Sequence, residues 1–349
     1  MIDIKYYDFE LPKDLIAQEP IEPRDKARLM ILKGETIVHR YFYEIIDEFD
    51  KGDLLIVNNS KVIPSRIYGN KSTGGKIEAL FIRDMSNKIG EKDLWLVILK
   101  GHGLKPGVKL IFKGKDIILE GEICEWVENG KFLVKFYPKD KSIRSILNKI
   151  GIIALPPYIK KKFNDYNIYQ TVYSKVKGSI AAPTAGLHFT RKLLKDLKLK
   201  GVELCYLTLH ISASSFVPVE QNNINKSPLD PEFYSIPDKT IKLYNKAVSK
   251  NSNIFIVGTT TMKALESACD ENGLIIQPEG FSDLFISPGY KFKSKVSRFI
   301  TNFHTPKSPP LLMVSAFYGW NKLKRAYQVA IDRKYRFYSF GDAMLIYRP

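Results

Sequence analysis

Three histidines in polar loops are the side chains of this sequence most suited to chemistry. His188 lies in a loop that also contains a proline and a glycine, which break the pattern of a packed helix or strand. His210 follows an apolar run, and His304 lies between Asn302 and Lys307. Because imidazole changes charge near neutral pH, these loops together predict a ligand site. A structural role is the alternative for each histidine taken alone.

The spacing of the ligand-type residues argues against a metal site. None of the five histidines belongs to a His-x-x-x-His pair, and Cys124, Cys205 and Cys269 are widely separated. Zinc sites need clustered ligands, and a disulfide framework needs paired cysteines. We therefore expect neither a metal nor a disulfide framework.

An apolar run followed by Gly258–Thr261 and a helical pattern could hold an anion. The free N–H groups, the hydroxyls and the positive dipole end of such a helix suit a carboxylate or a phosphate. The sequence matches neither the Walker pattern nor the Gly-x-Gly-x-x-Gly fingerprint, and threonines are also ordinary helix caps. Asn58 and Asn59 end another apolar run, and Asp342 follows Gly341. Turn-forming and ligand-binding roles both stay open for these three polar residues.

The pattern of apolar runs predicts the frame that brings these loops together. Residues 1–65 and 156–349 alternate helical and strand patterns, which predicts a main α/β domain with a mixed sheet. Residues 66–155 hold short alternating runs separated by turn signals, which is typical of a small β-barrel. The fold class that we expect is α/β, with a discontinuous main domain and an inserted β-barrel domain.

Individual elements follow from the same patterns. In the main domain we expect helices at 191–199, 237–249, 259–270 and 320–333, and strands at 201–209, 253–257, 298–302 and 336–340. In the inserted domain we expect strands at 76–83, 94–99, 108–112, 117–124 and 132–136, followed by a helix at 142–150.

Charge and hydropathy narrow the class of protein. The 349 residues carry a formal net charge of +17, so a nucleic acid is a natural partner. A solvated, lysine-rich surface is the alternative reading of that charge. No apolar run reaches the ~18 residues that span a bilayer, and the N-terminus lacks the pattern of a signal peptide. We expect a soluble, cytoplasmic protein without a membrane segment.

Short strings along the chain form one specific pattern. They are Phe9–Pro12, Gly52–Asn59, Val62–Arg66, Gly74–Glu78, Leu155–Ile159, Tyr169–Ser174, Ala181–Phe189, Leu207–His210, Gly258–Thr260, Leu265–Ser267, Ile300–His304, Tyr335–Phe337 and Gly341–Met344. In this order and over nearly the whole length, they resemble the S-adenosylmethionine:tRNA ribosyltransferase-isomerases of queuosine biosynthesis.

The resemblance implies a transferase-isomerase that uses S-adenosylmethionine as a ribosyl donor. The acceptor would be 7-aminomethyl-7-deazaguanine at the wobble position of a tRNA, and the products would be epoxyqueuosine-tRNA, adenine and methionine. The sulfonium acidifies the C5′ proton, so the reaction would need neither a metal nor a second cofactor. S-adenosylmethionine would then be a co-substrate and the tRNA anticodon stem-loop the partner, and we expect a monomer.

The resemblance also implies site residues. Proton transfer needs a group with a pKa near the working pH, and His188 and His210 are the catalytic candidates, in either order. The turn at Gly258–Thr261 would receive the methionine carboxylate. The residues expected to bind substrate are Asn58, Asn59, Arg66, Pro183, Thr184, Gly186, Phe189, Gly258, Thr259, Thr260, Thr261, Glu266, Asn302, His304, Lys307 and Asp342.

Several stretches depart from the family pattern. The family usually has Val-Gly-Ala-Gly-Thr-Phe where residues 211–216 read Ile-Ser-Ala-Ser-Ser-Phe. A family His-x-Met-His-x-Glu stretch is replaced at 226–232, where only Glu232 matches. A family arginine becomes Lys263, which cannot form bidentate contacts. The alternatives are therefore a tRNA-binding paralogue with lost or altered catalysis and an enzyme acting on a small deazaguanine-like molecule.

Overall fold

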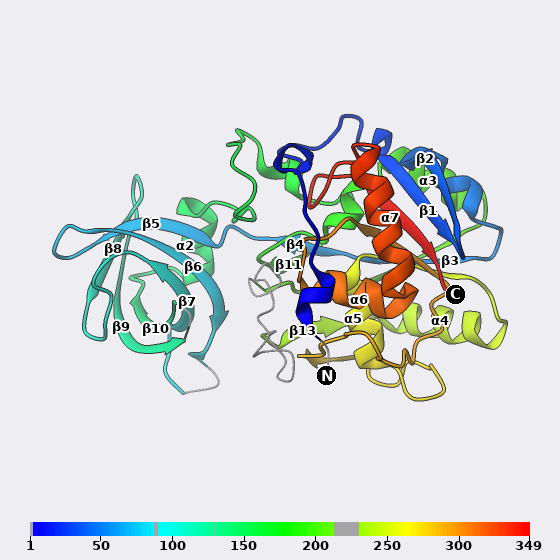
Figure 1. Cartoon of the computed structure of the whole chain (residues 1–349). Coiled ribbons are helices and arrows are strands. Elements are labelled where there is room, and N and C mark those ends of the chain that lie inside the picture. The colour runs from blue at the N-terminus through cyan, green and yellow to red at the C-terminus, as the bar shows by residue number, and fades with distance from the viewer. Residues whose placement is uncertain (1–2, 87–89, 129, 213–229) are drawn as a thin grey trace. The chain divides into compact units, whose positions relative to one another are not determined.

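The computed structural model describes residues 3–86, 90–128, 130–212 and 230–349. The chain divides into two compact units, Met1–Lys61 with Pro156–Pro349, and Val62–Leu155 (Figure 1). The first unit is a mixed α/β structure and the second contains a closed barrel, which confirms the expected fold class. Independent folding of the two units, which the expected domains imply, stays a prediction.

Within the described residues, the first unit is built on a nine-stranded mixed sheet (Figure 1). Its strands are β1 Arg28–Lys33, β2 Thr36–Tyr41, β3 Leu54–Asn58, β12 Glu203–Leu209, β13 Glu232–Ser235, β14 Ile254–Val257, β15 Glu279–Ser282, β16 Arg298–Asn302 and β17 Ala343–Tyr347. Their order is β15-β13-β12-β3-β14-β16-β17-β1-β2. The four strands β12, β3, β14 and β16 run parallel to one another, and β17 is antiparallel to β16.

The sheet is buried on both faces, which explains why its central strands are continuous apolar runs. In β3, Leu54 and Ile56 belong to one core, whereas Leu55 and Val57 belong to another. The first core also takes side chains from α4 Asp238–Ser249, α5 Thr259–Ala268, α6 Pro309–Tyr318 and α7 Trp320–Asp332. The second takes side chains from α3 Arg191–Leu199 and from the 3₁₀ helix Phe42–Glu48.

The second unit is a barrel that closes in the order β10-β7-β6-β5-β8-β9 in the part of the chain that is described. Its strands are β5 Arg66–Lys71, β6 Lys76–Asp84, β7 Leu94–Lys100, β8 Lys109–Lys113, β9 Ile118–Glu128 and β10 Lys131–Tyr137. The alternation expected from the sequence is present, since Leu110 and Phe112 are buried and their neighbours in β8 are not. The amphipathic helix α2 Ile143–Ile150 contributes Ile146 and Leu147 to the barrel core.

Most of the expected elements of the first unit are confirmed, but the expected last strand at 336–340 is wrong. These residues are irregular, and the last strand is β17 instead. Tyr338 has a φ of 71°, which an extended strand does not allow. Two short strands, β4 Ser60–Val62 and β11 Val176–Ser179, form a separate two-stranded sheet. Among the described residues, no helix is both long and apolar enough to span a bilayer.

Candidate functional site at the carboxyl edge of the sheet

The parallel strands of the central sheet bring the polar loops to one edge. His210 follows β12, Asn58 ends β3, Gly258 follows β14 and Asn302 ends β16. Because these four strands are parallel neighbours, their carboxyl ends lie at the same edge of the sheet. Open α/β sheets bind ligands at this edge. The loops that the sequence singled out therefore lie together at one edge of the sheet.

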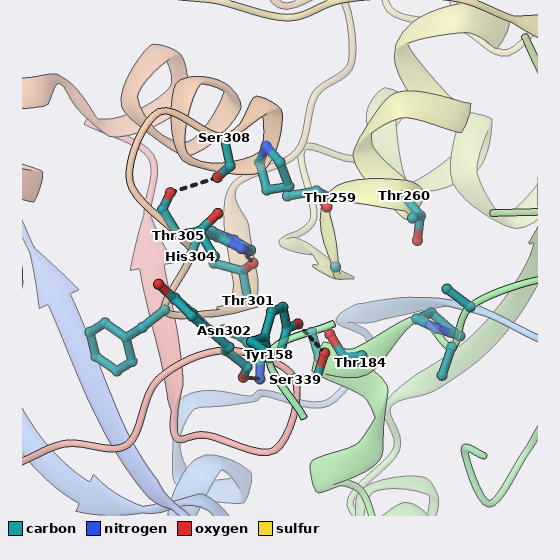
Figure 2. A pocket seen from close by; sticks show the side chains of 18 of the residues that line it. Tyr158, Thr184, Thr259, Thr260, Thr301, Asn302, His304, Thr305, Ser308 and Ser339 are labelled. Atoms are coloured by element: carbon teal, nitrogen blue, oxygen red, sulfur yellow. Dashed lines mark hydrogen bonds between the residues drawn. The ribbon is translucent and has the colours of Figure 1, made fainter. Parts of the chain in front are cut away.

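A cavity of about 640 Å³ opens at this edge. Its volume falls within the range of about 300–1,000 Å³ that is usual for small-molecule sites. Figure 2 shows the side chains of Thr184, Thr259, Thr260, Asn302 and His304 around it. The expected site residues that line the cavity are Pro183, Thr184, Gly258, Thr259, Thr260, Asn302, His304 and Lys307.

The N-terminus of α5 forms one wall of the cavity. Gly258 caps this helix with φ 86° and ψ 152°, a conformation that is essentially limited to glycine. Thr261 N donates to Gly258 O at 3.1 Å, whereas the amides of Thr259 and Thr260 have no acceptor within the helix, and both threonines line the cavity. This wall can therefore bind a carboxylate or another anion.

Lys307 and Asp8 place one charge of each sign on the lining. Lys307 Nζ lies 2.5 Å from Asp8 Oδ2, and both residues line the cavity. The pair suits a ligand that carries both an ammonium and a carboxylate. Lys307 can form a charged hydrogen bond with the carboxylate of the ligand, and Asp8 can form one with its ammonium.

His304 is the histidine of the lining, and burial keeps it neutral. Its Nε2 lies 2.8 Å from Thr301 Oγ1, and its backbone N–H donates to the Tyr327 hydroxyl at 2.8 Å. Burial lowers the pKa of His304 to about 3. At neutral pH the imidazole is therefore uncharged and has one nitrogen that can accept a proton.

His188 lies behind the lining. Its ring stacks on Phe42 with ring centroids 4.9 Å apart. Burial lowers the pKa of His188 to about 4, and the nearby Asn302 side chain opposes part of this effect. Among the described residues, neither His188 Nε2 nor Asn302 Oδ1 has a hydrogen-bond partner of good geometry. His188 is thus a neutral imidazole next to a residue of the cavity wall.

His210 also lies outside the lining. Its ring stacks on Phe233 with centroids 6.0 Å apart, and it packs so closely on Gly178 that a Cβ there would lie 2.7 Å from the imidazole. The next residue, Ile211, lines the cavity instead. The catalytic roles expected for His188 and His210 stay predictions.

Asn58 and Thr261 support the lining from behind it. The Asn58 amide donates to Leu209 O at 3.0 Å and to Thr260 Oγ1 at 3.2 Å, so it ties the ends of β3, β12 and α5 together. The Thr261 hydroxyl donates to Val257 O at 2.5 Å. Both residues position the α5 wall without lining the cavity.

Two expected carboxylates are occupied by protein partners. Glu266 accepts hydrogen bonds from Lys293 N at 2.8 Å and Ser294 N at 3.0 Å. Asp342 accepts from Arg28 N at 2.9 Å and Arg336 N at 2.8 Å, while burial raises its pKa. These bonds account for the burial of both carboxylates without a ligand, and their substrate-binding roles stay predictions.

The other expected residues also lie outside the lining. Arg66 belongs to the barrel, where its Nε is 3.2 Å from Glu78 Oε1. Asn59 Oδ1 accepts from Thr208 Oγ1 at 2.7 Å. Phe189 packs edge-on against Phe42. Gly186 is buried against the Tyr173 hydroxyl, which a Cβ at 186 would approach to 2.0 Å.

The sequence reasoning missed an aromatic and hydroxyl wall of the cavity. Tyr158 and Tyr338 have ring centroids 4.8 Å apart, and the Tyr158 hydroxyl lies 2.6 Å from Ser339 Oγ (Figure 2). Burial raises the pKa of Tyr158 to about 12, so its hydroxyl stays protonated. Tyr158 falls within the string Leu155–Ile159, which was the available signal. The missed lining residues with polar side chains include Asp8, Tyr158, Thr301, Thr305, Ser308, Tyr338 and Ser339.

The departures from the family pattern are only partly visible. Residues 213–229 lie outside the described residues. Lys263 lies within α5 and forms a buried ion pair with Glu232, with Nζ 3.1 Å from Oε2. Glu232 Oε1 accepts from Ser212 N at 2.7 Å. The lysine thus pairs with the one surviving acidic residue of the altered stretch. In the described ranges, no group of three or more His, Cys, Asp or Glu side chains is arranged to hold a metal ion.

Comparisons with known proteins agree over the whole chain. A family model described as "Queuosine biosynthesis protein" matches residues 4–346. The chain is 46% identical over 345 residues to the S-adenosylmethionine:tRNA ribosyltransferase-isomerase of Acetivibrio thermocellus, with 98% of each chain covered. It is 42% identical over 347 residues to the protein of the same name from Natranaerobius thermophilus, covering 98% of this chain and 99% of the other. The crystal structure of S-adenosylmethionine tRNA ribosyltransferase from Thermotoga maritima is 35% identical, with a TM-score of 0.54, and the match covers 98% of this chain and 99% of that one.

Proposed function

This chain belongs to the S-adenosylmethionine:tRNA ribosyltransferase-isomerases of queuosine biosynthesis, and from that premise we propose how its carboxyl-edge cavity forms epoxyqueuosine in tRNA. The main support for this proposal is that 98% of the chain aligns, at 46% identity, with the ribosyltransferase-isomerase of Acetivibrio thermocellus. S-adenosylmethionine is the ribosyl donor, and 7-aminomethyl-7-deazaguanine in the tRNA is the acceptor. A base removes the acidified C5′ proton, adenine leaves, the aminomethyl nitrogen attacks the sugar, and closure of the epoxide expels methionine.

We propose that the cavity binds S-adenosylmethionine with its methionine part at the α5 wall. The N-terminus of α5 would hold the carboxylate, and Lys307 with Asp8 would meet the charges of the amino acid. Tyr158 and Tyr338 offer faces for a purine or deazapurine ring. Because the sulfonium itself activates C5′, we propose that the reaction uses no metal and no second cofactor.

We propose that one of three imidazoles at this edge, His188, His210 or His304, removes the C5′ proton. The position of His304 on the lining favours it, because a base must come within hydrogen-bond reach of the proton that it abstracts. Burial keeps His188 and His304 neutral at pH 7, which is the protonation state that a base needs, although pKa values of about 4 and about 3 make both weaker bases than an imidazole of ordinary pKa.

Replacing each histidine by glutamine separates the three candidates. In D₂O the enzyme should incorporate deuterium at C5′ of S-adenosylmethionine, and His304→Gln should reduce both this exchange and adenine release by about 10²–10⁴-fold. His188→Gln and His210→Gln, as matched controls, should retain the exchange better. If one of the controls loses exchange and His304→Gln keeps it, the base is the control residue.

We propose that the acceptor is the anticodon stem-loop of a tRNA and that the protein acts as a cytoplasmic monomer. The net charge of +17 favours RNA, and an anticodon loop presents unstacked bases that a cavity can receive. The location follows from the substrates, since both tRNA and S-adenosylmethionine are available in the cytoplasm. Sedimentation of the protein with and without tRNA would measure the oligomeric state.

The function is tested by release of labelled adenine from S-adenosylmethionine. We expect release with tRNA that carries the 7-aminomethyl base, and none with the same tRNA lacking it. Retention of tRNA without turnover over a range of pH and salt would identify a non-catalytic paralogue. Release with the free base alone would identify an enzyme for a small molecule.

A further inference from the structure

A second cavity lies in the first unit, apart from the lining of the first cavity. It has a volume of about 700 Å³ and shares no lining residue with the carboxyl-edge cavity. Its walls come from α3, from β12, from the segment after the 3₁₀ helix Tyr166–Tyr169, and from Asn59. None of the steps proposed above uses it.

Four cationic side chains line this second cavity. Arg191, Lys195 and Lys198 stand on the exposed face of α3 at i, i+4 and i+7, and Lys175 joins them from the preceding segment. The opposite face of α3 is buried in the second core. Because residues three and four positions apart share one face of a helix, these three side chains all line the same cavity.

These four cations have no acidic partner among the described residues. The acid of α3, Asp196, pairs with Lys192 at 2.6 Å and is therefore occupied. No ion pair or side-chain hydrogen bond joins Arg191, Lys195, Lys198 or Lys175 to another described residue. Like charges that converge without counter-charge repel one another, and a bound anion removes that cost.

Two tyrosines also line this cavity, together with Asn59 and the apolar residues Val172, Leu194, Leu204 and Pro237. Tyr173 and Tyr206 have ring centroids 6.3 Å apart at an interplanar angle of 57°. The Tyr173 hydroxyl is buried and has no hydrogen-bond partner in the described part of the chain. Cations beside aromatic rings are the combination that nucleic-acid surfaces use to hold phosphates and stack bases.

The second cavity also adjoins the reaction site through shared segments. The Tyr173 hydroxyl abuts Gly186, and the same loop carries Thr184 and Ala185 of the carboxyl-edge lining. Asn59 lines the second cavity, and its neighbour Asn58 holds Thr260 of the α5 wall.

We propose that the second cavity binds backbone phosphates of the tRNA substrate, with Arg191, Lys195, Lys198 and Lys175 as the phosphate ligands. This inference rests on the proposed function, because it assigns the surface that holds the RNA whose modified base enters the first cavity. The phosphates of a free nucleotide or inorganic phosphate share the same chemistry, so the experiment includes them.

The test is the salt dependence of tRNA binding by the full-length protein. For Lys195→Gln/Lys198→Gln, the slope of log K against log salt should become shallower by about 1.4–1.8, since each lost phosphate contact removes about 0.7–0.9. The KM for tRNA should rise by a larger factor than the KM for S-adenosylmethionine, which a general structural defect would not produce. The matched control is Lys242→Gln/Lys246→Gln, which removes two exposed lysines at similar spacing from α4.

Each outcome decides the proposal. An unchanged slope in Lys195→Gln/Lys198→Gln, or an equal change in the control, overturns it. Calorimetric binding of inorganic phosphate or a mononucleotide that this variant loses, with tRNA binding intact, also overturns it and assigns a small-anion site. If wild-type protein binds tRNA with the expected slope but releases no adenine, the proposed function fails while the RNA-binding surface stands.

Discussion

At the scale of single residues, the buried histidines make the stability of the protein depend on pH. Burial lowers the pKa of His188 to about 4, below the ~6.5 of an unfolded chain. Between these values the unfolded chain binds a proton that the folded chain does not, so the free energy of unfolding falls as the pH falls. The contribution of His188 is fully present above pH 6.5, and about 3 kcal/mol of it is lost by pH 4.

The comparison of wild type with His188→Gln isolates this contribution. Guanidinium unfolding at pH 7 and at pH 4.5 should show a loss of stability that is about 2–3 kcal/mol smaller in the variant. The carboxylates titrate in both proteins and cancel in the difference. Equal losses in the two proteins would mean that His188 keeps an ordinary pKa in the folded state.

Gly186 is required for space rather than for backbone freedom. A Cβ at this position would lie 2.0 Å from the Tyr173 hydroxyl and 3.0 Å from Thr171 Cγ2. We expect Gly186→Ala to lower the free energy of unfolding by about 1–3 kcal/mol, as overpacking does. Tyr173→Phe removes a hydroxyl that has no partner in the described structure, so alone it should cost little. In the double variant it should recover part of the loss, and strictly additive effects would contradict the contact.

At the scale of elements, the start of α5 can be compared with the start of α7. Gly258 and Gly319 are both N-cap residues with positive φ, 86° and 93°. Alanine at either position should cost about 1–3 kcal/mol of stability, because the backbone conformation excludes a Cβ. Only Gly258 lines the carboxyl-edge cavity. Gly258→Ala should therefore raise the KM for S-adenosylmethionine, and Gly319→Ala should not; a similar rise in both would show that the α5 wall does not bind the donor.

The elements that the sequence predicted best are those whose apolar pattern decides their position. The run at 253–257 is buried on both faces as β14, and the loop after it reaches the cavity as expected. By contrast, β5 was not expected, because only Ile67 of its six residues is buried and its pairing with β6 and β8 is non-local. A local pattern holds no information about such pairing.

The site was predicted where a loop follows a regular strand and was missed where irregular segments meet. Thr259, Thr260 and His304 come within three residues of the ends of β14 and β16, so their side chains could be placed at the sheet edge. Tyr158 and Ser339 lie in irregular segments that are far apart in the sequence and meet through one hydrogen bond. The expected strand at 336–340 also hid the turn at Tyr338, whose positive φ is set by tertiary contacts such as its N–H bond to Phe303 O.

At the scale of the whole molecule, the barrel has the features of an insertion that folds by itself. Its core draws only on residues between Ile67 and Leu147, with partly buried neighbours up to Ile150. Its two ends are joined within the unit, since Ile152 N donates to Arg66 O at 2.8 Å and Ser65 N donates to Ile152 O at 3.1 Å. A segment with its own core and adjacent ends can enter a loop of another domain without disturbing that domain.

We therefore expect residues 62–155, expressed alone, to unfold cooperatively and to share a midpoint with one transition of the full-length protein. Phe136→Ala removes a buried ring from the barrel core and should lower the free energy of unfolding of the barrel by about 3–5 kcal/mol in both proteins. Phe255→Ala is the matched change in the sheet of the first unit. It should lower only the free energy of unfolding of the first unit. A single transition shifted equally by both variants would show that the two units fold as one, because a perturbation in either core would then be felt by the whole chain.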